Sequence, residues 1–288
     1  MDHPHDKYYI PHGSHWPVVG SFALFMMLGG FAVYLNGAAI GGTASLFGLA
    51  LLVVMLAGWF GTVIAESMSG CYNAQVDKSF RMGMMWFIFS EVMFFAAFFG
   101  ALFYARQLVI PWLGGEGTKF MTNLMLWPGF EALWPSNGPA HAGGKFETMA
   151  AAGLPAINTA ILLSSSVTIT IAHHALKNGN RLLLNLGVLV TVILGFIFIF
   201  LQATEYMHAY SELNLKLSTG IYGSTFFVLT GFHGLHVTIG AIFLTVIWFR
   251  VLRGHFTPQK HFAFEAAAWY WHFVDIVWLC LYFFVYWL

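Results

Sequence analysis

The chain has 288 residues, of which 59% are hydrophobic and 8% are charged, and its 12 basic and 12 acidic residues give a formal net charge of zero. This composition excludes a water-soluble globular protein, which could not bury so much apolar surface, and indicates an integral membrane protein. The balanced charge argues against nucleic acid as a partner and against anionic substrates. Cys71 and Cys280 are far apart and form no CxxC pair, so the sequence indicates no redox dithiol and no cysteine metal site.

The hydrophobic pattern predicts an all-α protein with seven transmembrane helices. No Lys, Arg, Asp or Glu occurs from residue 8 to 65, and we expect Asn36-Gly37 and Gly41-Gly42-Thr43 to divide this run into two spans, at about 16–35 and 46–65. A polar inner loop, residues 66–81, precedes the third span. The other four spans are expected at about 154–176, 182–204, 220–249 and 266–288.

The third span contains one acidic residue in an apolar setting. Between Arg81 and Arg106 lie 24 residues, and Glu91 is the only charged one among them. At about 1.5 Å per residue a helix of this length extends roughly 36 Å, enough to cross a hydrocarbon core of roughly 30 Å. An acid at this depth rarely faces lipid. Because its neighbours on the same helix are apolar, we expect Glu91 to find a partner on another helix or another chain.

The positions of the basic residues predict the orientation. With the N-terminus in the cytoplasm, the inner segments hold Lys7, Lys78, Arg81, Lys177, Arg181, Arg250, Arg253 and Lys260, and the outer segments hold Arg106, Lys119, Lys145 and Lys216. Eight basic residues against four favour this orientation by the positive-inside rule. Residues 106–153 then form a long outer loop, and the C-terminus lies outside.

Polar residues within the spans form three pairs with a spacing of three, which places each pair on one helix face. The pairs are Glu205 with His208, His233 with His236, and His272 with Asp275. Glu-x-x-His resembles half of a di-iron site, but such a site needs two copies and two further carboxylates, and one copy is present. We therefore interpret these residues as buried polar groups that hydrogen-bond between helices, with His272 and Asp275 as a pair, and predict no metal site.

Two other positions have simple interpretations from their places in the spans. Glu205 falls at the outer end of its span, where we expect water to reach it. His173 and His174 fall at the inner end of the fourth span, and we interpret them as interfacial anchors.

Several blocks resemble cytochrome c oxidase subunit III, in a bacterial form, in the same order from about Trp59 to the C-terminus. They are WFIFSEVMFF (86–95), LSSSVTITIAHHAL (163–176), QATEY (202–206), IYGSTFFVLTGFHGLHVTIG (221–240) and FEAAAWYWHFVDIVW (264–278). The resemblance implies a single membrane domain over residues 1–288. In it, helices one and two (residues 1–65 with the tail) splay from helices three to seven (82–288), leaving a V-shaped cleft that holds phospholipids.

The resemblance also implies the function. The chain would be a noncatalytic subunit without a redox centre, in a proton-pumping oxidase of the bacterial inner membrane. Its partners would be the haem-copper subunit I, which is catalytic, and the copper-bearing subunit II. It would stabilise the catalytic subunit against inactivation during turnover and support its proton uptake.

By position, Glu91 matches the family's intramembrane glutamate, Arg250 matches an arginine that contacts a lipid headgroup, and Trp59 and Glu66 match cleft positions. Guanidinium binds phosphate through two parallel hydrogen bonds, which suits Arg250 at headgroup depth. The chain departs from the family where it reads Trp59-Phe60 in place of paired tryptophans, and Cys71-Tyr72-Asn73 in place of a His-Thr-Pro stretch.

Two alternatives remain from the residues themselves. An independent proton-linked transporter could use Glu91, Glu205 and Asp275 as a relay, and would purify without haem-bearing partners. A membrane metalloenzyme would carry a bound metal in the isolated chain.

Overall fold

The computed structural model describes Tyr9, Ile10 and residues 13–287, and these residues form helices joined by turns and loops. Within that part of the chain, seven helices are long and apolar enough to cross a membrane, as predicted. They are Trp16–Leu35, Ile40–Met68, Ala74–Leu113, Leu154–Lys177, Arg181–Ser211, Gly220–Leu252 and Phe262–Trp287. The chain forms two compact units, which meet in the sequence between Met82 and Gly83 and are described separately.

In the first unit, α1 (Trp16–Leu35) and α2 (Ile40–Met68) pack together as a helical hairpin. The turn needs Gly37, whose φ of +90° lies in the left-handed region. The prediction that Gly41-Gly42-Thr43 also breaks the helix is wrong, because α2 already begins at Ile40. Gly41 instead lies against the backbone of α1 around Tyr34, where an added Cβ would collide. Glycine here permits close helix contact rather than a turn.

The third helix begins earlier than predicted. α3 (Ala74–Tyr104) includes residues that we expected in the 66–81 loop. The backbone N–H of Val76 donates to Oδ1 of Asn73 (3.0 Å), and Asp77 lies in the first turn. An asparagine cap and an early acid are favourable at a helix N-terminus, so local capping extends the helix beyond its apolar stretch.

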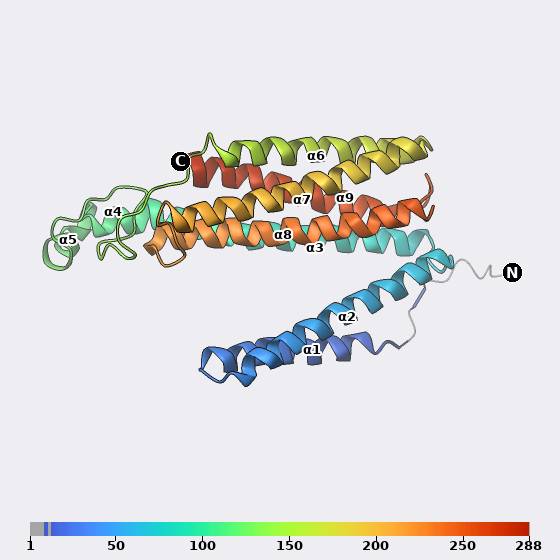
Figure 1. Ribbon diagram of the computed structural model, residues 1–288, viewed down its shortest axis with the longest axis horizontal. Coiled ribbons are helices and arrows are strands. Elements are labelled where there is room, and N and C mark those ends of the chain that lie inside the picture. Colours follow the sequence, from blue (N-terminus) through green and yellow to red (C-terminus); the bar gives the residue numbers. More distant parts are fainter. Residues whose placement is uncertain (1–8, 11–12, 288) are drawn as a thin grey trace. The chain divides into compact units, whose positions relative to one another are not determined.

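The second unit contains the residues of α3 from Gly83 onward together with four long helices, α6 (Leu154–Lys177), α7 (Arg181–Ser211), α8 (Gly220–Leu252) and α9 (Phe262–Leu281). These five helices run side by side (Figure 1). The last described residues, Tyr282–Trp287, continue α9 as a π-helix.

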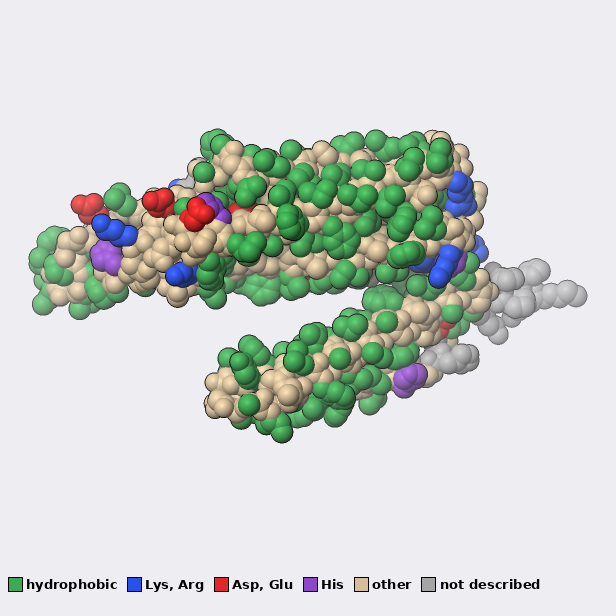
Figure 2. Space-filling model, viewed as in Figure 1, with side chains coloured by type: hydrophobic (Ala, Val, Ile, Leu, Met, Phe, Trp, Pro, Cys, Tyr) green, Lys and Arg blue, Asp and Glu red, His purple; other side chains and the backbone are tan. Residues whose placement is uncertain are grey.

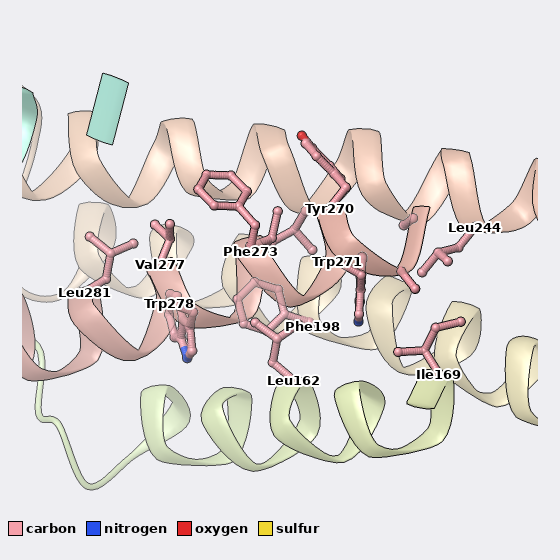
Figure 3. Close-up of a cluster of buried hydrophobic side chains, with 14 of the residues drawn as sticks. Leu162, Ile169, Phe198, Leu244, Tyr270, Trp271, Phe273, Val277, Trp278 and Leu281 are labelled. Carbon is pink, nitrogen blue, oxygen red and sulfur yellow. The ribbon is translucent and has the colours of Figure 1, made fainter. Parts of the chain in front are cut away.

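The core of this unit is built around α9. Figure 3 shows Trp271 and Trp278 directed from α9 towards α6. Each indole N–H donates to a hydroxyl of α6, that of Trp271 to Ser165 (2.9 Å) and that of Trp278 to Thr159 (2.9 Å). Both tryptophans are fully buried. The same two side chains therefore provide apolar packing and hydrogen bonds between α9 and α6.

The predicted outer loop, residues 106–153, contains several short helices. The third span continues through a π-helical turn (Ala105–Val109) into α4 (Ile110–Leu113), and a 3-10 turn (Gly117–Lys119) leads into α5 (Phe120–Leu126). Figure 1 shows α4 and α5 extending beyond the ends of the long helices of this unit. The helix continues beyond Arg106, where we expected the span to end, because an apolar stretch extends to Leu113. The Asn123 amide donates to carbonyl oxygens of Leu113, Trp127 and Phe130, which stabilises the segment.

Apolar side chains cover the flanks of the long helices of the second unit, and charged side chains gather at the helix ends (Figure 2). Trp86 and Phe200 are examples, with 68% and 66% of their surface exposed. An apolar flank between two charged ends is the surface that a bilayer requires, so the protein is a multi-pass membrane protein.

Candidate functional site

Glu91 has a partner within the chain. Its Oε2 atom on α3 lies 2.9 Å from Nε2 of His236 on α8, and 21% and 11% of the two side chains are exposed. The other ring nitrogen of His236, Nδ1, lies 2.6 Å from the carbonyl oxygen of Phe232. A carbonyl oxygen only accepts, so Nδ1 carries a proton. One proton then lies between Nε2 and the carboxyl group. If Nε2 holds this proton, the pair is an imidazolium and a carboxylate; if Glu91 holds it, both groups are neutral.

Aromatic rings surround this pair. The rings of Phe94 and Phe95 lie 5.9 and 5.0 Å from that of His236, and the ring of Tyr270 stacks at 6.5 Å. The structure thus places Glu91 where an intramembrane acid is expected to lie, turned into the bundle. The sequence analysis named His236 as a buried polar group but did not pair it with Glu91, which is 145 residues away.

Glu205 does not lie where water reaches it, and that prediction is wrong. Its side chain is fully buried, and Oε1 accepts a hydrogen bond from the hydroxyl of Tyr286 at 2.6 Å. The cause is the π-helical end of the seventh span, which places Tyr286 over this part of α7. His208, predicted to be buried, has 40% of its side chain exposed and lies 3.2 Å from Glu212. The pair predicted from spacing is therefore split between the interior and the surface.

His233 is fully buried, and its ring nitrogens have no hydrogen-bond partner among the described residues. Its ring stacks on Trp278 at 5.1 Å and meets the edge of Phe198 at 5.7 Å. It packs as an aromatic side chain and does not make the interhelical hydrogen bond that we expected of it.

His272 and Asp275 are connected through a third residue. The hydroxyl of Ser166 on α6 donates to Oδ2 of Asp275 (2.8 Å) and lies 3.2 Å from Nδ1 of His272. Nε2 of His272 lies 3.3 Å from the hydroxyl of Thr170. Asp275 is buried and His272 partly exposed. The predicted role of these residues, to hydrogen-bond between helices, agrees with these contacts, which join α9 to α6.

The first unit contains a cavity of about 480 Å³ that Trp59 and Glu66 line. Further lining residues are Tyr9, Trp16, Thr62, Tyr72 and Phe80. The hydroxyl of Tyr72 donates to Oε2 of Glu66 at 2.8 Å. Burial and the adjacent carboxylate raise the pKa of Tyr72, so this hydroxyl keeps its proton. Tyr72 therefore holds the Glu66 carboxylate within an aromatic pocket.

Arg250 lies at the end of α8 and is 8% exposed. Its guanidinium lies over the ring of Phe256, 4.6 Å from the ring centre. Its Nε atom is buried and has no hydrogen-bond partner among the described residues. The structure thus holds the arginine against an aromatic ring, where it retains hydrogen-bonding capacity for an anionic group.

Comparison with known proteins identifies the family of the chain. The family model for cytochrome c oxidase subunit III matches residues 5–288. Cytochrome c oxidase subunit 3 of Lemur catta is 41% identical to this chain. The alignment covers the whole chain and 94% of the lemur protein. The proteins of the same name from Ovis aries and Gadus morhua are also 41% identical, with 99% of their lengths covered. The match extends further towards the N-terminus than the resemblance from Trp59. The chain belongs to the cytochrome c oxidase subunit III family.

Proposed function

We propose that this chain is a noncatalytic core subunit of a proton-pumping cytochrome c oxidase. It packs against the catalytic haem-copper subunit I, with the copper-bearing subunit II in the same complex, and carries no redox centre itself. The observation that carries the proposal is the family match over residues 5–288. The names of the relatives support an oxidase complex as the setting.

The intramembrane acids support a structural role. Glu91 pairs with His236 of α8, Asp275 with Ser166 of α6, and Glu205 with Tyr286 at the end of the seventh span. Each acid thus joins a different pair of helices, and the hydrogen bonds of the described residues link none of the acids to another. A proton-linked transporter would need such a connection, so this arrangement favours the oxidase subunit over the relay.

The chain also binds structural phospholipid in this proposal. Arg250 offers a buried guanidinium for a phosphate, and Trp59 and Glu66 line the cavity of the first unit. In this proposal the whole chain acts in the membrane as a single domain, and lipid binds at Arg250 and at the cavity that Trp59 and Glu66 line. Lipid held in this way stabilises the catalytic subunit during turnover and supports its proton uptake.

The charge distribution supports the proposed orientation of the chain in its membrane. The bacterial inner membrane is the proposed location, with the N-terminus in the cytoplasm and the C-terminus in the periplasm. Eight of the 12 basic residues then lie on the inner side.

Purification in mild detergent, with a haem spectrum and identification of the subunits, tests the proposal. We expect the chain to co-isolate with haem- and copper-bearing subunits, and we expect the chain alone, separated from them, to show no haem absorption. A chain that purifies free of partners would support the transporter. Haem bound to the isolated chain would overturn the noncatalytic role.

A further inference from the structure

Two histidines and a glutamate meet at the end of α6. His173 lies on α6 four residues before its last residue, Lys177, while His261 immediately precedes α9 and Glu265 lies in its first turn. One ligand atom from each of the three lies within 4.8 Å of the other two. All three residues are partly buried. The group shares no residue with the sites described above.

The ring of His261 is oriented to leave one lone pair available. Nδ1 of His261 lies 3.1 Å from the carbonyl oxygen of Thr257, so Nδ1 carries the proton and Nε2 keeps its lone pair. A ligating histidine is commonly fixed by such a bond from its other nitrogen. Nε2 of His173 is buried and has no hydrogen-bond partner among the described residues, and it lies 3.9 Å from Oε1 of Glu265.

The backbone and the neighbouring rings hold these side chains in place. The backbone N–H of Glu265 donates to the carbonyl oxygen of His261 at 3.1 Å, which fixes the two residues as one turn. The ring of Phe264 packs against that of His173 at 5.7 Å. With 21% and 14% of the side chains of His173 and Glu265 exposed, an ion can reach the group from outside.

We propose that His173, His261 and Glu265 form a binding site for a divalent transition-metal ion of the zinc type. Two imidazoles and one carboxylate are a typical three-residue zinc set, which leaves the fourth tetrahedral position for water or another ligand. Zinc bonds of about 2.0–2.2 Å place neighbouring ligand atoms roughly 3.3 Å apart, so the side chains close by about 1 Å around the ion. The C-terminus of α6 near His173 favours a cation, whereas the N-terminus of α9 near His261 and Glu265 opposes one.

The local charges set a limit on affinity. Lys177 follows His173 by one helical turn and Lys260 precedes His261. The Glu265 carboxylate offsets one of these positive charges. We therefore expect a site that exchanges its ion and prefers zinc to magnesium or calcium, which require more oxygen ligands.

The test is a zinc titration of the purified, detergent-solubilised protein after treatment with a chelator, read by competition with a zinc-sensitive dye. We expect His173→Ala and Glu265→Gln to weaken one zinc site by at least about tenfold. His174→Ala is the matched control, because this neighbour is an exposed histidine that is not among the three ligands. It should change the affinity by less than about twofold.

Zinc X-ray absorption on the unsubstituted protein gives a second measurement, which does not depend on whether a variant folds. Two imidazole nitrogens and a carboxylate oxygen at about 2.0–2.2 Å are expected. Equal zinc affinity in His173→Ala and the unsubstituted protein would overturn the proposal. So would an equal loss in His174→Ala, or an absorption spectrum without imidazole.

Discussion

At the scale of single residues, three acids within the spans each form a hydrogen bond with a side chain of a different kind. Glu91 meets an imidazole, Asp275 a serine hydroxyl and Glu205 a tyrosine hydroxyl. These bonds reduce the cost of placing a carboxyl group in the bundle and select which helices lie together. The best supported is that of Glu91, because the other nitrogen of His236 is itself fixed by the carbonyl oxygen of Phe232.

The coupling between Glu91 and His236 can be measured with a double-mutant cycle on the free energy of unfolding in detergent. Interhelical hydrogen bonds in membrane proteins contribute about 0.6 kcal/mol on average and up to about 1.7 kcal/mol. We expect Glu91→Ala with His236→Ala to give a coupling near the upper value, because the pair is largely buried and shares a proton. Purely additive costs of the two substitutions would contradict a direct bond.

The sequence identified the polar residues of the spans but not their partners. Spacing of three correctly placed His272 and Asp275 on one face, since spacing is a local property of a helix. The partner of Glu91 is 145 residues away, and several histidines in the spans were equal candidates. The group of His173, His261 and Glu265 was missed for the same reason. Only the packing of α6 against α9 brings those residues together.

At the scale of elements, apolar length placed the helices well and local chemistry decided their ends. α1 begins and ends where predicted, whereas α3 starts early because Asn73 caps it. Glycine was ambiguous in the sequence, because it occurs both in turns and at close helix contacts. Gly37 makes a turn, but Gly30 and Gly41 lie where the backbones of α1 and α2 are in close contact. Both roles need the absence of a side chain, and the sequence alone does not distinguish them.

Gly29 and Gly30 provide a matched test of helix contact in the first unit. An added Cβ at Gly30 would meet the backbone of Ser45, at 2.5 Å, whereas at Gly29 it would meet nothing within 4 Å. We expect Gly30→Ala to lower the free energy of unfolding by about 1–3 kcal/mol through overpacking. Gly29→Ala should be neutral or stabilising by up to about 1 kcal/mol. Detergent-induced unfolding measures both, and equal effects would refute the close contact.

At the scale of the whole molecule, the chain combines apolar flanks with hydrogen bonds between helices inside the second unit. The proposed role is that of a subunit that supports a neighbour and leaves redox chemistry to it. The two consequences that can be measured are the orientation of the helices and the durability of the complex.

Reporter fusions test the orientation. A reporter after Leu288 should behave as periplasmic, and a reporter in the turn at residues 178–180 between α6 and α7 should behave as cytoplasmic, because basic residues concentrate on that side. The reverse pattern would overturn the charge argument.

Removal of the subunit tests its role. The haem spectrum of the partner should be nearly unchanged, and initial oxygen consumption should be near normal at low pH and slower at high pH, where protons are scarce. Activity should then decay with turnover. Oxygen uptake followed over time at two pH values, with and without the subunit, measures this.

Arg250→Ala should show a milder decay, because it loosens one headgroup and leaves the rest of the subunit in place. Immediate loss of the haem signal on removal of the subunit would contradict the role. So would decay no faster than that of the intact complex.

The pairing of the acids also sets an order of events during synthesis. Glu91 is made 145 residues before His236, and Glu205 is made 81 residues before Tyr286. At a synthesis rate of about 5–20 residues per second, roughly 7–30 s pass between the synthesis of Glu91 and that of His236. During that interval α3 and α7 are present in the ribosome-bound chain with carboxyl groups that have not met their partners. The five-helix bundle therefore closes only after α8 and the end of the seventh span have emerged.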